Sequence, residues 1–176
     1  LLIKSGMIYK NDNGIYSYLP MGLKVLENVK NIIREEMKKN NADEVLMPSL
    51  VDRNVFELTN REKIFGKEIF NIKGRNNKEY SLCPTHEELF ALLVRNKIRS
   101  YKDLHFTLFQ LSNKFRDEVH PEYGLIRKKE FYMADAYSFD ADESGLDISY
   151  DKMYQTFNNV FKRLNIDTMV VRADPD

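Results

Sequence analysis

Two strand-like runs in the second half of the chain decide its fold. They are residues 106–118, FTLFQLSNKFRDE, and residues 125–139, LIRKKEFYMADAYSF. A short loop joins them and contains Pro121 and Gly124, two residue types that are typical of turns. We therefore expect a long antiparallel hairpin at the centre of the domain.

Side chains on a strand alternate between its two faces, so each run predicts which residues share a surface. One face of the first run carries Lys114, Arg116 and Glu118. One face of the second run carries Arg127, Phe131, Met133, Asp135 and Tyr137. If the two faces coincide, one surface holds arginines, carboxylates and aromatic rings, a set suited to a nucleotide. A solvated face with cross-strand ion pairs is the alternative, and alternation alone favours it.

The remaining patterns predict helices and short strands around this hairpin. Apolar residues at helical spacing predict helices over 22–39, over 89–98 and from about Leu146 onward. Short strands are predicted over 69–72 and 80–83, as a second hairpin, and over 43–50, as an edge strand interrupted by Pro48. These elements predict an α+β domain, an antiparallel β-sheet flanked by helices. The chain lacks βαβ alternation and a GxGxxG motif, which argues against a Rossmann fold.

Composition narrows the class of protein. The chain has 176 residues, 43% hydrophobic and 31% charged, which is typical of one globular domain. Its 27 basic and 27 acidic side chains cancel, which argues against a generally basic surface for nucleic acid. One cysteine, Cys83, and three histidines exclude an internal disulfide and predict no metal site. The longest apolar run, residues 90–94, is too short to cross a bilayer, so we expect a cytoplasmic protein without membrane contact.

Three short segments have a structural and a functional interpretation. Thr85 and Glu88 fit a capping box for the following helix, but this box leaves Glu87 unexplained, so we expect both roles for the segment. Residues 140–145, DADESG, imitate the start of a calcium loop, yet a turn that caps the last helix fits them better. Cys83 is expected to be an unreactive small residue beside this segment.

Several motifs in collinear order carry a family resemblance over nearly the whole chain. Residues 115–118, FRDE, with Arg127 and Phe131 after the loop, resemble motif 2 of class II aminoacyl-tRNA synthetases, and residues 45–48, VLMP, resemble motif 1. The other segments are LCPTHEE at 82–88, DAYSF at 135–139 and the opening residues 5–20. They are similar to bacterial-type prolyl-tRNA synthetases.

This resemblance implies a role for each matched residue. Arg116 would be the catalytic residue, bridging the α-phosphate of ATP and the amino-acid carboxylate. Glu118 would accept from the adenine amino group, Arg127 would reach the γ-phosphate, and Phe131 would stack on adenine. Proline would be bound by Thr85, Glu87, Arg116, Met133, Asp135 and Tyr137. The acceptor stem of the tRNA would be contacted by His120 and Glu122.

The resemblance also implies an activity and an assembly. The activity is ATP- and Mg²⁺-dependent conversion of proline to prolyl-adenylate, followed by transfer to tRNA(Pro), in a homodimer formed through motif 1. Residues 1–176 would be the N-terminal part of the catalytic domain, without motif 3 or an anticodon-binding domain, and inactive by themselves. A threonyl enzyme of the same subclass and a non-catalytic RNA-binding paralogue are the alternatives.

Three positions depart from the family pattern. Lys129 stands where arginine is usual, and it keeps the charge but loses the bidentate fork. His120 and Glu122 replace arginines that are usual in the loop. The two loop changes bear on contact with the tRNA acceptor stem and not on the adenylate chemistry.

Overall fold

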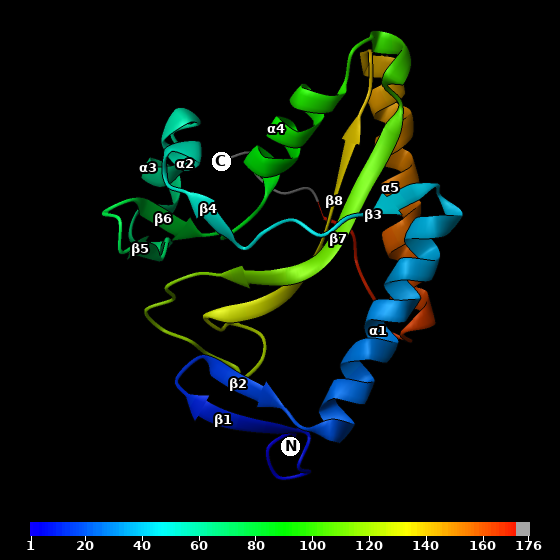
Figure 1. Cartoon of the computed structure of the whole chain (residues 1–176). Helices are drawn as coiled ribbons and strands as arrows, with labels where there is room; N and C mark the ends of the chain where they lie inside the picture. The colour runs from blue at the N-terminus through cyan, green and yellow to red at the C-terminus, as the bar shows by residue number, and fades with distance from the viewer. Residues whose placement is uncertain (172–176) are drawn as a thin grey trace.

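The centre of the domain is one long antiparallel hairpin, which the computed structural model shows within the described residues 1–171 (Figure 1). Strand β7 (Phe106–Phe115) pairs with β8 (Glu130–Phe139) along its whole length. A short strand, β3 (Ala42–Glu44), adds to β7 in parallel, so the sheet order is β3-β7-β8. The predicted hairpin is confirmed. Its connection is longer than predicted, because β7 ends at Phe115 and β8 begins only at Glu130, so that residues 116–129 lie between the strands.

Helices α1 (Pro20–Lys39) and α5 (Glu143–Arg163) cover one face of this sheet (Figure 1). Phe109 of β7 is fully buried there with Met37 and Ala42. Partly buried apolar side chains complete this core: Ile33, Leu111, Ala136, Met153 and Phe157. Because side chains alternate along a strand, burying Phe109 on this side turns the even-numbered residues of β7 to the opposite face. The helices predicted over 22–39 and from Leu146 are confirmed, each beginning slightly earlier.

A second, smaller sheet lies apart from the two long helices (Figure 1). Its strands are β4 (Leu50–Asp52), β6 (Glu79–Leu82) and β5 (Asn71–Lys73), all antiparallel and in that spatial order. Helical elements beside it are α2 (Asn54–Leu58), α3 (Arg61–Phe65) and a 3₁₀ turn (Gly66–Glu68). Helix α4 (Glu87–Lys97) follows β6, and a second 3₁₀ turn (Tyr101–Asp103) precedes β7 at the far end of the long hairpin. Val51, Phe56 and Cys83 form the buried core beside the smaller sheet. The predicted second hairpin is confirmed as β5 and β6.

The single edge strand predicted over 43–50 is wrong in its extent. The segment divides into β3 and β4, which lie at the edges of two different sheets. Pro48 falls between them and has no N–H to donate to either ladder, which explains the break. The expected edge position is confirmed for both pieces.

The two predicted helix caps have opposite outcomes. At α5, Asp142 Oδ1 accepts a hydrogen bond from the Gly145 N–H at 2.8 Å, so the predicted capping turn is confirmed. At α4, the predicted capping box is wrong. His86 occupies the N-cap position without a side-chain cap, because the helix begins one residue later than the box requires. The Thr85 hydroxyl instead donates to the Glu87 carboxylate.

An N-terminal hairpin packs against the 116–129 connection. Its strands are β1 (Ile8–Asp12) and β2 (Ile15–Tyr18). Gly14 at the turn has φ +75°, and a Cβ there would lie 2.8 Å from Pro121 Cγ, so this close approach requires glycine. The Lys129 N–H donates to the Gly14 carbonyl at 3.0 Å. Lys128 Nζ donates to the Tyr18 hydroxyl at 2.9 Å, so the hairpin holds the connection in place.

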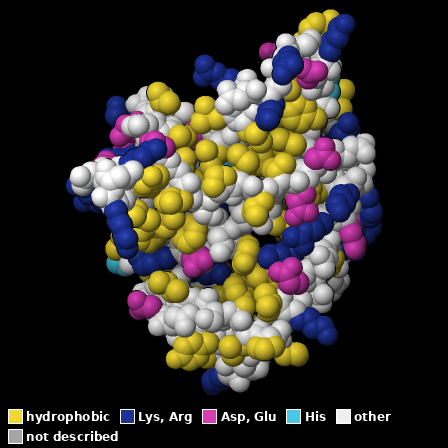
Figure 2. Space-filling view, in the orientation of Figure 1, with side chains coloured by type: hydrophobic (Ala, Val, Ile, Leu, Met, Phe, Trp, Pro, Cys, Tyr) yellow, Lys and Arg dark blue, Asp and Glu magenta, His cyan; other side chains and the backbone are white. Residues whose placement is uncertain are grey.

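The surface carries hydrophobic patches interspersed with charged side chains on the face shown in Figure 2. Within residues 1–171, no helix combines the length and apolar character needed to cross a bilayer. Across the same residues, no group of three or more His, Cys, Asp or Glu side chains is arranged to hold a metal ion.

Candidate active site

The register of β7 and β8 brings the two predicted faces together. Lys114 lies opposite Phe131, and Asp135 lies opposite Gln110. Met133 and Tyr137 follow the same alternation, so these side chains share the sheet face turned away from α1 and α5. The prediction that the two faces coincide is confirmed for the residues inside the strands.

Alternation does not place Arg116, Glu118 and Arg127, because all three lie in the connection beyond the regular strands. The backbone leaves the ladder at this point. The Arg116 N–H still pairs across the hairpin, donating to the Lys129 carbonyl at 2.9 Å, but the Asp117 N–H donates to the Glu68 carbonyl at 2.7 Å. A hydrogen bond to a distant segment therefore turns the chain out of the ladder at Asp117.

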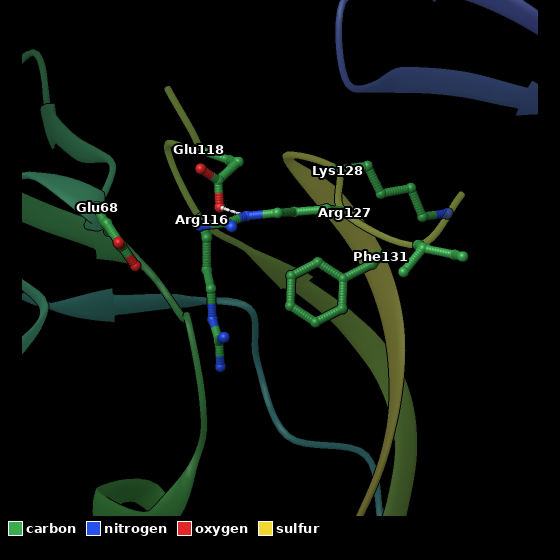
Figure 3. A pocket seen from close by; sticks show the side chains of 7 residues that line it. Glu68, Arg116, Glu118, Arg127, Lys128 and Phe131 are labelled. Atoms are coloured by element: carbon green, nitrogen blue, oxygen red, sulfur yellow. Dashed lines mark hydrogen bonds and ion pairs between the residues drawn. The ribbon is translucent and has the colours of Figure 1, made fainter. Parts of the chain in front are cut away.

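A cavity of about 290 Å³ opens where the connection leaves the sheet (Figure 3). Its lining consists of Glu68, Arg116, Glu118, Ile126, Arg127, Lys128 and Phe131. The four residues predicted to bind ATP therefore come together here. Arg127 Nε donates to Glu118 Oε2 at 2.6 Å, and this bond holds the pKa of Glu118 below its ordinary value. The same hydrogen bond raises the pKa of Arg127.

The Arg116 side chain links this cavity to the segment before α4. In Figure 3 its guanidinium points away from the Glu118–Arg127 pair. The guanidinium carbon lies 5.4 Å from the ring centre of Phe131 and 5.6 Å from that of Phe65. Nη2 is 3.5 Å from the Pro84 carbonyl oxygen, while the buried Nε has no partner among residues 1–171. Arg116 thus offers hydrogen-bond donors to an anion between the cavity and residue 84.

A pocket-like set of polar groups lies on the other side of Pro84. Thr85 is buried, whereas the Glu87 side chain is 44% exposed and lies 3.6 Å from Arg61 Nη2. The Tyr137 hydroxyl donates to Asp135 Oδ2 at 2.9 Å, and its ring centre lies 4.2 Å from that of Phe90 on α4. Burial raises the pKa of Tyr137, so this phenol stays protonated and can act as a donor. An exposed carboxylate beside aromatic rings suits a small cationic amine.

Two buried residues of the same segment have structural roles. Burial raises the pKa of the Cys83 thiol to about 12, as expected of an unreactive cysteine. The His86 ring lies with Nε2 3.1 Å from the Pro48 carbonyl oxygen, and burial together with the nearby Lys114 charge lowers its pKa. A neutral imidazole donating to Pro48 ties this segment to the piece of chain between β3 and β4.

His120 and Glu122 lie outside the cavity, in the exposed part of the connection. The His120 N–H donates to Glu118 Oε1 at 3.4 Å, and Glu122 forms an isolated antiparallel bridge with Arg127. The segment that carries them is thus attached to the cavity residues through its backbone.

Sequence reasoning assigned no role to several residues of the site. Lys128 and Glu68 line the cavity, and Lys114 and Gln110 bond Asp135. Lys114 lies two positions before Arg116 on the same strand face, which was the one signal for its position. Glu68 comes from the distant 3₁₀ turn, and nothing in the local sequence indicates it.

The second half of the chain matches a known family. Residues 70–176 match the tRNA synthetase class II core domain (G, H, P, S and T). Over 174 residues, 99% of this chain, it is 50% identical to the proline–tRNA ligase of Caldicellulosiruptor bescii. Over the same length it is 48% identical to the proline–tRNA ligase of Staphylococcus epidermidis. The chain spans 30% and 31% of the length of these two relatives.

Solved structures share the fold. The prolyl-tRNA synthetase of Giardia lamblia in complex with prolyl-adenylate superposes with a TM-score of 0.85 at 20% identity, over 92% of this chain and 34% of that one. The Cryptosporidium parvum enzyme with L-proline and AMP gives a TM-score of 0.81 at 19% identity, over 93% and 33% of the two chains. At these identities the similarity is one of fold.

Proposed function

Because this chain belongs to the family of class II tRNA synthetase core domains, we propose that the protein containing it activates proline with ATP and transfers it to tRNA(Pro). The observation that carries the proposal is the position of Arg116. Its side chain lines the cavity with Glu118 and Arg127, and it also reaches the Pro84 carbonyl, next to Thr85. One arginine thus stands where an α-phosphate and an amino-acid carboxylate would meet.

The reaction matches the groups present. A carboxylate oxygen of proline attacks the α-phosphorus of ATP, a mixed anhydride forms, and the bond to pyrophosphate breaks. Because the carboxylate is already a nucleophile, the step needs positioning and charge stabilisation, not a general base. Arg116 would bridge the α-phosphate and the proline carboxylate. Arg127 would leave its ion pair with Glu118 and bind the γ-phosphate. A ribose hydroxyl of the tRNA then attacks the prolyl carbonyl, and AMP leaves.

Both substrates find side chains of suitable chemistry. Adenine would stack on Phe131, with its amino group donating to Glu118. The secondary amine of proline would meet Thr85 and Glu87, with Met133, Asp135 and Tyr137 around the ring. Magnesium would enter as part of MgATP, bound mainly by phosphate oxygens and water.

The proposal extends to domain organisation and partners. We propose that residues 1–176 supply motifs 1 and 2 of a larger catalytic domain, since the chain spans about 30% of the length of its relatives. A homodimer through the motif 1 region is supported by exposed apolar side chains there, including Leu46 at 80% exposure. The exposed part of the connection, with His120 and Glu122, would meet the tRNA acceptor stem. The setting would be the cytoplasm, and we propose no membrane partner.

Proline-dependent exchange between ATP and pyrophosphate tests this function in the complete protein. We expect exchange with proline well above that with threonine, followed by charging of tRNA(Pro). Exchange with threonine instead would assign a sister synthetase. RNA binding without any amino-acid-dependent exchange would assign a non-catalytic paralogue, and either result would overturn the proposal.

A further inference from the structure

A fully buried lysine lies beneath the amino-acid pocket and has no part in the chemistry above. Lys114 has 0% exposure, and its Nζ donates to Ser112 Oγ at 2.7 Å and to Asp135 Oδ1 at 2.8 Å. Burying an ammonium group is costly unless a close counter-charge and hydrogen bonds compensate it. Burial lowers the pKa of Lys114, and the Asp135 hydrogen bond opposes this effect.

The Asp135 carboxylate is already occupied by protein donors. Oδ1 accepts from Lys114, while Oδ2 accepts from Gln110 Nε2 and from the Tyr137 hydroxyl, each at 2.9 Å. Gln110 is itself fixed, because its Oε1 accepts the Met47 N–H at 3.1 Å. Three donors use most of the acceptor capacity of one carboxylate. Asp135 therefore serves the protein, and little of it remains for a substrate amine.

Glu87 contrasts with Asp135 in this pocket. Its side chain is 44% exposed, and its described partners are the Thr85 hydroxyl and, at 3.6 Å, Arg61. It is the carboxylate that a substrate amine can reach. Tyr137 lies between the two acids: its hydroxyl is directed to Asp135, and its ring packs on Phe90. The shape of the pocket around Tyr137 therefore depends on where Asp135 is held.

We propose that Lys114 is a positioning residue for amino-acid recognition, which holds Asp135 and through it Tyr137, and so leaves Glu87 to bind the substrate amine. This inference rests on the proposed function and refines it. Asp135 changes from a proline ligand to a support for the pocket wall. Neither Lys114 nor Gln110 would touch ATP or proline.

Steady-state exchange with the complete protein and its variants tests the inference. Lys114→Met keeps the length of the side chain but leaves Asp135 as a buried, uncompensated charge. Loss of a charged hydrogen bond predicts a KM for proline raised about 10- to 100-fold, with the KM for ATP changed less than about twofold. The double variant Lys114→Met/Asp135→Asn removes both charges, and its new amide oxygen can still accept from the Tyr137 hydroxyl, so we expect most of the affinity for proline to return.

Two further variants complete the design. Lys128→Met is the matched control, because Lys128 is also a buried lysine but bonds Tyr18 outside the pocket. Since Lys128 lines the cavity proposed for ATP, this variant should change the KM for ATP and not the KM for proline. Tyr137→Phe removes only the hydroxyl, which donates to the Asp135 carboxylate, and should raise the KM for proline about tenfold, the lower end expected for a hydrogen bond to a charged group. If thermal melting shows that Lys114→Met does not fold, Tyr137→Phe serves as the test of the positioning role.

The outcomes are distinct. Equal changes in both KM values, or no recovery in the folded double variant, would overturn the positioning role and leave the proposed function standing. If Lys114→Met is unfolded, an unchanged KM for proline in Tyr137→Phe would also overturn the positioning role and leave the proposed function standing. A parent protein without proline-dependent exchange would reject the proposed function and this inference together.

Discussion

The cavity beside Arg116 and the polar groups around Asp135, where we propose that ATP and proline bind, lie on the same face of the β7–β8 hairpin, but they hold their charges differently. In the cavity, the Arg127 side chain is 59% exposed and its partner Glu118 is 14% exposed. In the pocket, Lys114 is fully buried and Asp135 is 9% exposed. Water and salt weaken an exposed pair, whereas a buried pair is costly to break. The exposed cavity charges can therefore change partners more readily than the buried pair.

The difference arises from where the strands end. Lys114 and Asp135 lie inside the ladder, on the face where Phe90 of α4 packs against Tyr137, and both are shielded from water. Arg127 and Glu118 lie in the connection, where one side faces solvent. Arg116 is between the two regions, beside aromatic rings and with a buried Nε that lacks a described partner. The following predictions test this division, from the largest expected effect to the smallest.

Replacing Arg116 should have the largest effect, because this residue would serve both regions. We expect Arg116→Ala to lower the rate of proline-dependent exchange about 10²- to 10³-fold, the usual loss for one preorganised charge-stabilising donor. Arg116→Lys should rescue poorly, since an ammonium cannot donate a planar fork to two anions. Retention of most of the exchange activity by Arg116→Lys would exclude the bridging role.

Changing Glu87 should affect the amino-acid pocket alone. Glu87→Gln keeps the size of the side chain and removes its charge, so the KM for proline should rise about 10- to 100-fold, with little change for ATP. Glu88→Gln is the neighbouring control, because Glu88 is buried, bonds Thr59 and shares Arg61 with Glu87. We expect this control to lower the melting temperature without a selective effect on proline. Equal changes for both substrates in Glu87→Gln would indicate a collapsed segment.

Changing Arg127 should affect the nucleotide cavity alone. We expect Arg127→Ala to raise the KM for ATP about tenfold and to leave the KM for proline unchanged, a loss typical of one charge-assisted contact. Arg75→Ala, in the exposed turn between β5 and β6, makes the same charge change away from the cavity and should have no effect. A selective rise in the KM for proline would remove the distinction between the two regions.

The same variant has a signature in the titration of Glu118. Arg127 holds the pKa of Glu118 below its ordinary value, so the pair stabilises the fold above that ordinary value and loses this effect as pH falls through the lowered pKa. In Arg127→Ala, an NMR titration should show the pKa of Glu118 rising toward its ordinary value. A pKa that stays low would assign the shift to the weaker hydrogen bond from the His120 N–H.

The smallest effect is expected at His120, which lies outside both regions. His120→Ala should leave proline-dependent exchange intact and lower the efficiency of tRNA charging about two- to threefold, as for one exposed hydrogen bond. His120→Arg should raise the efficiency of charging, because an arginine stays charged and can donate two parallel hydrogen bonds to a phosphate. If exchange and charging fall together, the connection supports the adenylate site and does not contact tRNA.

The amino-acid sequence by itself determined most secondary-structure elements of this protein and its candidate site residues. The spacing of apolar residues was enough to predict α1, α5 and the β5–β6 hairpin, because each of these elements buries one of its faces. Alternation was enough to place Phe131, Met133, Asp135 and Tyr137 on one surface, since a strand has a period of two. The ordered motifs were enough to indicate the family, which the match over residues 70–176 then showed.

Tertiary structure decided where the strands stop and which charges meet. The chain leaves the ladder after Arg116, where the Asp117 N–H bonds the Glu68 carbonyl, a contact between distant segments that no local pattern predicts. The capping box failed for a related reason, since the Thr85 hydroxyl bonds the Glu87 carboxylate instead of the helix backbone. Burial of Lys114 against Asp135 depends on the register of two strands and on α4 lying over them. Local sequence specifies which face a side chain takes, but its partners are set by segments that meet only in the folded chain.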